Sequence, residues 1–152
     1  MSTTSVLGDG CKIGYETGSP LAFALIPELD SLSAFPIPKF DKLENTKHGS
    51  GGYRTYGFGL GSVDDFSSVH FFSAGNSVMQ AMLAAQAAKT LLTIKVEVPA
   101  TAAATTFISA EMQAYVSCQI DPPKDNWQKL TLTWQYAGGY ILTTTPTATD
   151  IT

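Results

Sequence analysis

The side chains that most often carry out catalysis are few in this chain, and their spacing does not favour it. The two histidines are His48, in a glycine-rich stretch, and His70, in an apolar run. The sequence has no HxxxH or CxxC pair and no carboxylate at the spacing that a zinc site needs. It also lacks a GxSxG elbow and a phosphate-binding loop. We therefore expect neither an enzyme nor a bound metal or cofactor.

The remaining reactive groups favour structural roles. Asp64 and Asp65 are adjacent, and neighbouring side chains of a strand point to opposite faces, so the two carboxylates cannot share one proton-transfer site. Two cysteines, Cys11 and Cys118, make no disulfide framework in a chain of this length. Because Cys118 belongs to an apolar alternation, we interpret it as a small core residue rather than a metal ligand.

That alternation, from Ile108 to Ile120, is the longest regular pattern in the sequence. Every second residue is apolar, and the residues between them are serine, glutamate, glutamine and tyrosine. A period of two predicts one β-strand with a buried face and a wet face. At about 3.3 Å per residue it spans roughly 43 Å, far more than an ordinary strand. Such a strand favours a curved sheet, or a sheet that a neighbouring chain completes.

Shorter stretches with the same period lie on both sides of it. Leu92 to Val98 and Leu130 to Tyr136 alternate clearly, and Gly138 and Gly139 are expected to end the second of these strands. Weaker strand candidates are 11–15, 21–26 and 63–72. Prolines favour an extended or edge segment over a helix between residues 27 and 38.

One helix is predicted, in the alanine-rich run from Val78 to Lys89. Ser77 and Gln80 form a capping box before it, and its methionines are interpreted as core filler. Residues 1–152 fit one domain. The fold class is therefore mainly β, a sandwich or barrel with one flanking α-helix.

Residues 41–62 differ in character from the rest of the chain. They mix charges with glycines and aromatic side chains, and too few apolar residues alternate for a core strand. We predict a long projecting loop, and loops beyond about 12 to 15 residues are usually functional or disordered. Tyr53, Tyr56 and Phe58 are residue types that are enriched in protein interfaces. A contact with another subunit and a flexible tether are both consistent with this composition.

Composition and charge narrow the classes of partner. Charged residues make up 14% of the chain, against roughly 25% in soluble domains, and the formal net charge is -4. No basic stripe is present that would bind phosphates or an anionic membrane. No apolar run approaches the ~20 residues of a membrane span, and the N-terminus has no signal-peptide pattern. We expect synthesis in a cytoplasm, and a neutral surface that suits packing against copies, although a small β domain poor in charge would look the same.

The two ends of the sequence are predicted to lie outside the core. Residues 1–10 are small, polar and rich in glycine, which is typical of an arm. Residues 143–152 are rich in threonine and have little to bury. We expect this tail to be disordered or draped on a neighbouring subunit.

Several stretches in this order resemble the major tail tube proteins of long, non-contractile bacteriophage tails. They are LENTKHGSGGYR at 43–54, SVHFF at 68–72, LAA at 83–85, TIKVEV at 93–98 and FISAEMQAYV at 107–116. The resemblance covers about residues 40 to 136. That family folds as a β-sandwich or barrel flanked by a helix, and is similar to the tube proteins of contractile tails and type VI secretion systems.

The resemblance implies a structural role in a virion tail. Six subunits would form a ring, their sheets would join into an inner β-barrel, and stacked rings would conduct the viral DNA without specific binding. A tape-measure protein and tail-end proteins are the implied further partners. A ring protein at the end of the tail is not distinguished from the tube subunit itself.

Residue roles within such a tube are hypotheses at this point. A wall that lets DNA slide should be acidic or neutral, because each basic contact adds binding to phosphate. Polar positions of the long strands are therefore expected to face the lumen, namely Lys95, Glu97, Glu111 and Gln113. The outer wall remains an alternative for the same face. Contacts between subunits are expected from the long loop, through His48, Tyr53, Arg54, Tyr56 and Phe58.

Two other classes of function stay open. A carbohydrate-binding β-sandwich would use Tyr53, Tyr56 or Phe58 as stacking platforms for sugars. A lipocalin-type barrel would need about eight strands in one chain, whereas the sequence shows only about five or six.

Overall fold

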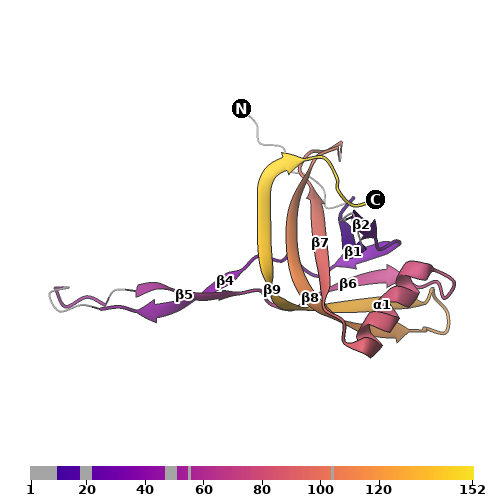
Figure 1. The fold of residues 1–152 in the computed structure, drawn as a ribbon, viewed down its shortest axis with the longest axis horizontal. Coiled ribbons are helices and arrows are strands. Elements are labelled where there is room, and N and C mark those ends of the chain that lie inside the picture. Colours follow the sequence, from indigo (N-terminus) through magenta and orange to yellow (C-terminus); the bar gives the residue numbers. More distant parts are fainter. Residues whose placement is uncertain (1–9, 18–21, 47–50, 55, 104) are drawn as a thin grey trace.

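The computed structural model describes residues 10–17, 22–46, 51–54, 56–103 and 105–152. One helix and nine strands make up this part of the chain (Figure 1). They are β1 (Lys12–Thr17), β2 (Ala22–Leu25), β3 (Leu29–Leu32), β4 (Lys39–Glu44), β5 (Tyr56–Ser62), β6 (Phe66–Phe71), α1 (Ser77–Ala88), β7 (Leu92–Pro99), β8 (Phe107–Asp121) and β9 (Lys129–Thr147). The predicted fold class, mainly β with one flanking helix, is confirmed.

Seven strands form one strongly curved antiparallel sheet in the order β2-β1-β7-β8-β9-β6-β3. β4 and β5 form a separate two-stranded sheet that projects from the body (Figure 1). In the large sheet, β8 pairs with β7 along one edge and with β9 along the other. β8 and β9 are therefore the central strands around which the other strands are arranged.

The long strand predicted around Ile108 to Ile120 is present as the 15 residues of β8. Its buried face carries Ala110, Met112, Ala114 and Val116, as the alternation predicted. The expectation of a curved sheet is also confirmed, because β8 and β9 bend together along their length (Figure 1).

The prediction that Gly138 and Gly139 end their strand is wrong. β9 continues through them for 19 residues, from Lys129 to Thr147. Their φ angles are 149° and 66°, and the register shifts there relative to Gln113 and Ala114 of β8. Glycine adopts such angles without steric cost, so a bulge bends the strand instead of breaking it.

The core lies between the apolar face of the sheet and helix α1. Leu130, Leu132 and Trp134 of β9 are fully buried, and Met79 and Met82 of α1 pack in the same cluster. The methionines are thus core filler, as predicted. Cys118 is half-buried against this cluster and is a free thiol, and burial raises its pKa to about 11.

The cap of α1 differs from the predicted capping box. Asn76, rather than Ser77, is the N-cap, and its Oδ1 accepts hydrogen bonds from the backbone N–H groups of Val78 at 2.9 Å and Met79 at 3.3 Å. Gln80 donates its side-chain N–H to the carbonyl oxygen of Ala74. Asparagine precedes serine here, and both residue types satisfy free amides at a helix start, so the sequence alone marked the helix one residue late.

The C-terminal tail is packed on its own chain, which corrects the expectation for residues 143–152. Residues up to Thr147 belong to β9, and Ile151 is buried. The backbone N–H of Leu25 donates to the carbonyl oxygen of Thr152 at 3.0 Å, so the tail extends the sheet beside β2. Gly14 provides the space, because a Cβ there would lie 2.7 Å from Cγ2 of Ile151.

Among the described residues, no helix has the length and apolar character that a membrane span requires.

Candidate assembly surfaces

The segment predicted as a long loop, 41–62, is instead most of a β-hairpin. β4 and β5 pair from Lys39 with Ser62 to Glu44 with Tyr56, and we call residues 39–62 the arm. Alternating apolar residues indicate a strand with one face in the core. This hairpin projects into solvent and has no core side, so its strands lack that pattern. Glycine at 57, 59 and 61 alternates with Tyr56, Phe58 and Leu60, which was the strand signal available in the sequence.

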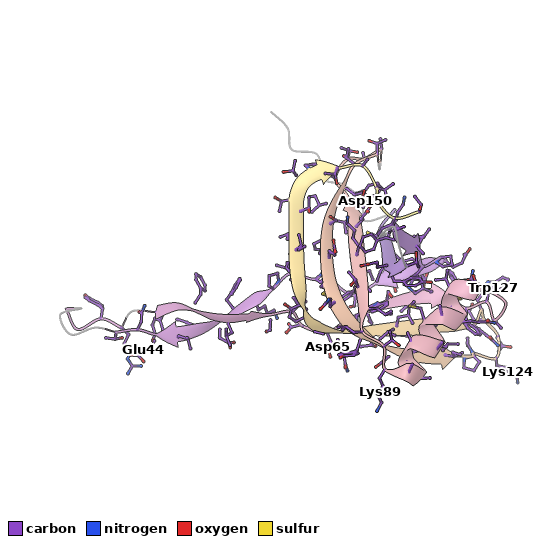
Figure 2. The ribbon with its side chains drawn as sticks, viewed as in Figure 1. Glu44, Asp65, Lys89, Lys124, Trp127 and Asp150 are labelled. Carbon is purple, nitrogen blue, oxygen red and sulfur yellow. The ribbon has the colours of Figure 1, made fainter. Side chains whose placement is uncertain are left out.

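Large apolar side chains are exposed along the arm, and side chains project from both of its sides (Figure 2). Phe58 and Leu60 are 86% and 87% exposed. Side chains of β4 cover two glycines of β5: Leu43 lies over Gly59, and Phe40 lies over Gly61. A concentration of exposed apolar side chains is typical of a surface that another molecule covers.

The base of the arm is fixed to the body. Lys39 Nζ lies 2.5 Å from Asp64 Oδ2, and the Tyr140 hydroxyl donates a hydrogen bond to the carbonyl oxygen of Pro36 at 2.6 Å. Immediately after the arm, Val63 and Phe66 are buried in the core. These contacts set the direction in which the hairpin projects.

Four of the five residues predicted for contacts between subunits lie on this hairpin. Tyr53, Arg54, Tyr56 and Phe58 are all exposed. His48 lies outside the described residues. Lys42 Nζ lies 3.8 Å from the ring centroid of Tyr56, and Arg54 Nε lies 3.8 Å from Glu44 Oε1.

β9 has an open edge along its second half. β8 pairs with β9 from Lys129 to Thr147, whereas β6 covers the other edge only from Lys129 to Trp134. No strand in the described part of the chain pairs with β9 beyond Trp134 on that side. Ile141 and Leu142 are exposed there on successive positions of the strand, which face opposite ways. An open edge with apolar neighbours is suited to pairing with a strand of another chain.

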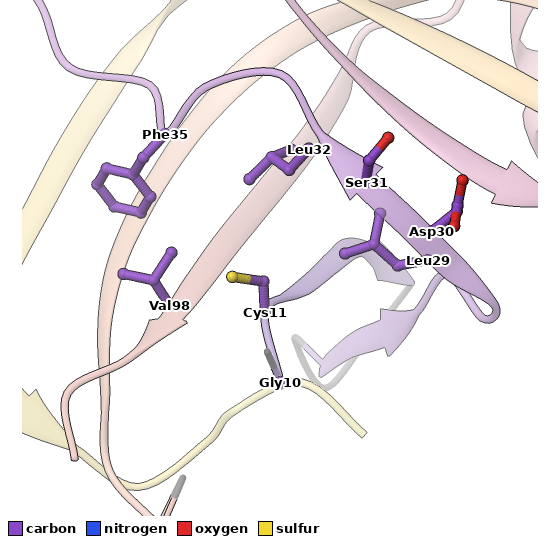
Figure 3. A pocket seen from close by; sticks show the side chains of 8 residues that line it. All are labelled: Gly10, Cys11, Leu29, Asp30, Ser31, Leu32, Phe35 and Val98. Atoms are coloured by element: carbon purple, nitrogen blue, oxygen red, sulfur yellow. The ribbon is translucent and has the colours of Figure 1, made fainter. Parts of the chain in front are cut away.

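A hollow of about 480 Å³ lies where β1, β3 and the end of β7 approach one another. Figure 3 shows the side chains of Cys11, Leu32, Phe35 and Val98 around it. Its described lining is mainly apolar, and no acid–base pair is found among those lining residues. No group of three or more metal-binding side chains occurs among the residues that the structure describes.

The four predicted lumen residues do share one face of the sheet. Lys95 pairs with Glu111 across β7 and β8, and Glu97 and Gln113 occupy same-face positions beside them. Glu111 is half-buried and Gln113 is exposed.

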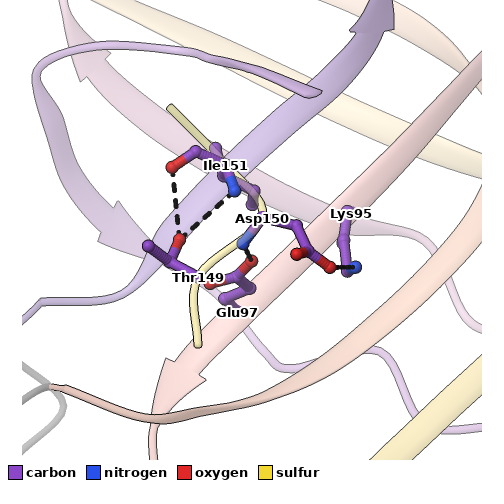
Figure 4. A network of polar contacts seen from close by, with 5 residues as sticks. All are labelled: Lys95, Glu97, Thr149, Asp150 and Ile151. Carbon is purple, nitrogen blue, oxygen red and sulfur yellow. Dashed lines mark hydrogen bonds and ion pairs between the residues drawn. The ribbon is translucent and has the colours of Figure 1, made fainter. Parts of the chain in front are cut away.

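Glu97 and Lys95, however, are covered by the C-terminal segment (Figure 4). Glu97 is 1% exposed, and its Oε1 accepts a hydrogen bond from the backbone N–H of Asp150 at 3.0 Å. Lys95 Nζ lies 2.6 Å from Asp150 Oδ2. The expectation that Glu97 faces an open space is therefore wrong for this chain, because the tail crosses β7 at this point.

His70 belongs to a buried hydrogen-bond network that the sequence analysis did not find. Its Nδ1 lies 3.0 Å from the carbonyl oxygen of Pro27, and its Nε2 lies 2.9 Å from Ser68 Oγ. Ser68 Oγ accepts a hydrogen bond from Trp134 Nε1–H at 3.2 Å. Burial lowers the pKa of His70. Ser68 and His70 are both fully buried, so a substrate has no access to them and the network is structural. The signal was the i, i+2 spacing of the two residues on one strand face.

No protein-family model matches the sequence, and neither does any curated protein. Solved structures do match the fold. The tail of an empty gene transfer agent particle, refined with C6 symmetry, is 15% identical and has a TM-score of 0.69 over 91% of this chain and 99% of its own. The SPP1 tail tube is 12% identical, with a TM-score of 0.67 over 91% of this chain and 79% of its own.

A component of the six-fold symmetrised baseplate of the anti-feeding prophage is similar as well. It is 9% identical, with a TM-score of 0.65 over 93% of this chain and 97% of its own. At these identities the likeness concerns the fold. The chain has, over nearly its full length, a fold that occurs in tail tubes and related particles.

Proposed function

We propose that this protein is the structural subunit of a virion tail tube. Six copies form a ring, and the rings stack into a hollow tube that conducts DNA. The observation that carries the proposal is the open edge of β9 in a curved sheet whose fold matches tube-forming particles. A structural role, without catalysis, also agrees with the fold of those neighbours.

Ring closure follows from the open edge. If β9 of each copy pairs with a strand of the next, the backbone groups along that edge gain hydrogen-bond partners, and a closed ring leaves no edge exposed. Ile141 and Leu142 would be buried in the same step. The C6 and six-fold symmetry of two matched particles supports six copies per ring.

The face that carries Glu111 and Gln113 then lines the lumen. Lys95 and Lys12 are basic side chains on this part of the face, because Lys12 of β1 pairs with Glu97 of β7. Lys95 is paired with Asp150, and this pairing weakens its attraction for phosphate. DNA would slide past a wall of this kind because few counterions are released by contact with it.

The arm supplies the contact between rings. We place the tube in a long, non-contractile tail, with a tape-measure protein inside it during assembly and tail-end proteins at its tip. The subunit is made in the cytoplasm of the host before it joins the virion.

A carbohydrate-binding module is the second candidate, and the arm argues against it. Stacking of a sugar needs an open aromatic face, whereas the Lys42 ammonium group lies over the ring of Tyr56. Phe58 is open, but the ring of Phe40 meets it edge-on, with the two ring centroids 5.9 Å apart, so these rings do not form a flat platform.

Negative-stain electron microscopy and sedimentation of the purified protein, at low and high concentration, test the proposal. Hollow filaments or stacked rings with sixfold symmetry are expected. A chain that stays monomeric at every concentration and binds glycans would contradict the tube and support the carbohydrate-binding alternative.

A further inference from the structure

A tube that grows by stacking identical rings needs two different surfaces on each subunit. A head-to-tail contact joins a donor surface of one copy to an acceptor surface of another, and the two must lie at opposite ends of the subunit for the contact to propagate. The arm is the donor in the function proposed above. The acceptor surface must then lie at the end of the subunit opposite the arm.

Trp127 marks the strongest candidate for the acceptor. It lies in the turn between β8 and β9 and is 76% exposed, more than any other large apolar side chain outside the arm among the residues that the structure describes. A tryptophan left in water is unusual, because its large ring gains much free energy from burial. Burial of this ring against another chain requires a concave surface beside it.

Such a surface is present, and we call it the acceptor hollow. It has a volume of about 460 Å³ and is lined by Glu28, Phe71, Phe72, Ser73, Asn76 and Trp127. Its backbone is held by two hydrogen bonds, from Phe71 N–H to the carbonyl oxygen of Glu28 at 2.9 Å and from Phe72 N–H to that of Gln128 at 2.8 Å. The hollow is thus preformed, with three aromatic side chains and one acidic side chain, Glu28, in its lining.

The position of the hollow suits a head-to-tail contact. Glu44 on the arm and Trp127 lie at opposite ends of the long axis of the molecule (Figure 2). At roughly 3.3 Å per residue, the 7 residues of β5 alone extend about 23 Å from the body. An arm of that reach can contact a second copy placed along the same axis.

The charges of the two ends are complementary. By sequence, residues 39–62 contain four basic and two acidic side chains, a net charge of +2. The segments that meet around the hollow, 27–32, 71–76 and 121–129, contain four acidic and two basic side chains, a net charge of -2. Lys129 is already paired with Asp30 at 3.2 Å. At the base of the arm, Lys39 is paired with Asp64, which lowers the net charge of the arm from +2 to +1. Complementary potentials of this kind favour the correct partner and orientation.

We infer that the acceptor hollow of one copy binds the arm of a second copy in the adjacent ring. Phe58 and Leu60 enter between Trp127 and Phe72, and Glu28 faces the basic side chains of the arm. This inference rests on the proposed function, since it names the partner surface of the arm.

Photo-crosslinking of the full chain tests it directly. Benzoylphenylalanine is placed at position 58, the protein is illuminated at assembly concentration, and the crosslinked peptides are identified by mass spectrometry. We expect crosslinks between copies to residues 71–76 and 121–129. The matched control carries the same probe at position 115, on the polar side of β8, and should not label those segments. Crosslinks from position 58 to other segments, or none at all, would overturn the inference.

Charge reversal gives an independent measurement. Glu28→Lys and Lys42→Glu should each lower the yield of tubes in low salt at least about tenfold, and the double variant should recover most of it. Trp127→Ala should still fold and form rings, because this side chain is exposed in the single chain and does not support the core. The rings should not stack, because the acceptor hollow has lost one of its aromatic side chains. Tubes from Trp127→Ala with wild-type length and yield would contradict the acceptor hollow only. A wild-type chain that forms no tubes would contradict the proposed function instead.

Discussion

His70 and Glu97 are titratable side chains that the fold buries almost completely, and they differ in how fully their polar atoms are hydrogen-bonded. The neutral ring of His70 is fully satisfied, because Nδ1–H donates to the Pro27 carbonyl oxygen and Nε2 accepts from the Ser68 hydroxyl. Glu97 Oε2, in contrast, is buried and has no hydrogen-bond partner among the described residues. The hydrogen bonds of His70 make it a stabilising element of the core, whereas Glu97 depends on the tail that covers it.

Removal of the Ser68 hydroxyl should destabilise the protein strongly. Ser68→Ala leaves Trp134 Nε1 and His70 Nε2 without partners, at a cost of about 1–3 kcal/mol for each buried group, so we expect a loss of about 2–6 kcal/mol in the free energy of unfolding. Urea denaturation measures it. Ser67→Ala, on the opposite face of β6, is the matched control and should change the value by no more than about 0.5 kcal/mol. Equal effects of the two variants would refute the network.

The stability of the protein should fall in mild acid. The pKa of His70 in the folded chain lies below the ordinary value of 6.5, so the unfolded chain binds more protons as the pH falls. The contribution of His70 is complete above about pH 6.5 and is lost below it, with a slope of at most about 1.4 kcal/mol per pH unit. Unfolding of the His48→Gln variant, followed between about pH 7.5 and about pH 5.5, assigns the effect to His70. A flat profile in that variant would count against this assignment.

At the scale of the elements, the bend of β9 separates a part of the strand that belongs to the core from a part that is proposed to contact another chain. Its first half is buried between β8 and β6, and its second half presents the open edge proposed for ring closure. Gly138 and Gly139 lie at the junction. The bend is therefore where a change of backbone should affect both stability and assembly.

Gly139→Ala tests the bend. The φ angle of 66° is left-handed, which costs an alanine about 1–2 kcal/mol, while the added Cβ would meet nothing closer than Gln113 Cγ at 3.6 Å. We expect the melting temperature to fall by about 2–8 °C. Gly75→Ala is the control, because a Cβ at Gly75 meets no atom within 4 Å and its φ is not left-handed. An unchanged melting temperature for Gly139→Ala would mean that the bend tolerates a side chain.

The arm should be dispensable for folding and necessary for stacking. Its described residues contribute nothing to the buried core, so a chain that lacks residues 49–58 should keep its circular dichroism spectrum and its cooperative unfolding. Electron microscopy should then show rings or small oligomers without tubes. Tubes of normal length from this deletion would remove the arm from the contact between rings.

At the scale of the whole molecule, the two faces of the sheet have different expected surroundings in a tube. The apolar face is closed by α1, and the face with Glu111 and Gln113 is proposed to line the lumen. The net charge of -4 and the pairing of Lys95 with Asp150 agree with a wall that does not hold DNA.

Glu111→Lys should convert that wall into one that binds DNA. Tubes of this variant should retain duplex DNA in low salt and release it in high salt, because the new contacts release counterions. Cosedimentation of tubes with labelled DNA measures the effect. Ala84→Lys adds a positive charge on the exposed side of α1 and serves as the control. If Glu111→Lys tubes bind no more DNA than the control, Glu111 does not line the lumen.

Local patterns in the sequence were sufficient for the main elements. The alternation in 108–120, 92–98 and 130–136 predicted β8, β7 and the first part of β9. The alanine-rich run at 78–89 predicted α1 and its buried methionines. These features follow from the two periodicities of side-chain direction, which act over a few residues and need no knowledge of the fold. The aromatic residues of the arm, in contrast, were singled out by their residue type and by the glycine-rich segment that carries them, without any periodicity.

Only the tertiary structure decided how distant segments meet. Glu97 is an outward position of β7 by alternation, but the last residues of the chain cross over it. Gly138 and Gly139 looked like a strand end because the sequence does not show that β8 continues beside them and accommodates a bulge. The hairpin of the arm was taken for a loop because its strands pair with each other and not with the core. Contacts of this kind depend on segments far apart in the chain, so no local pattern contains them.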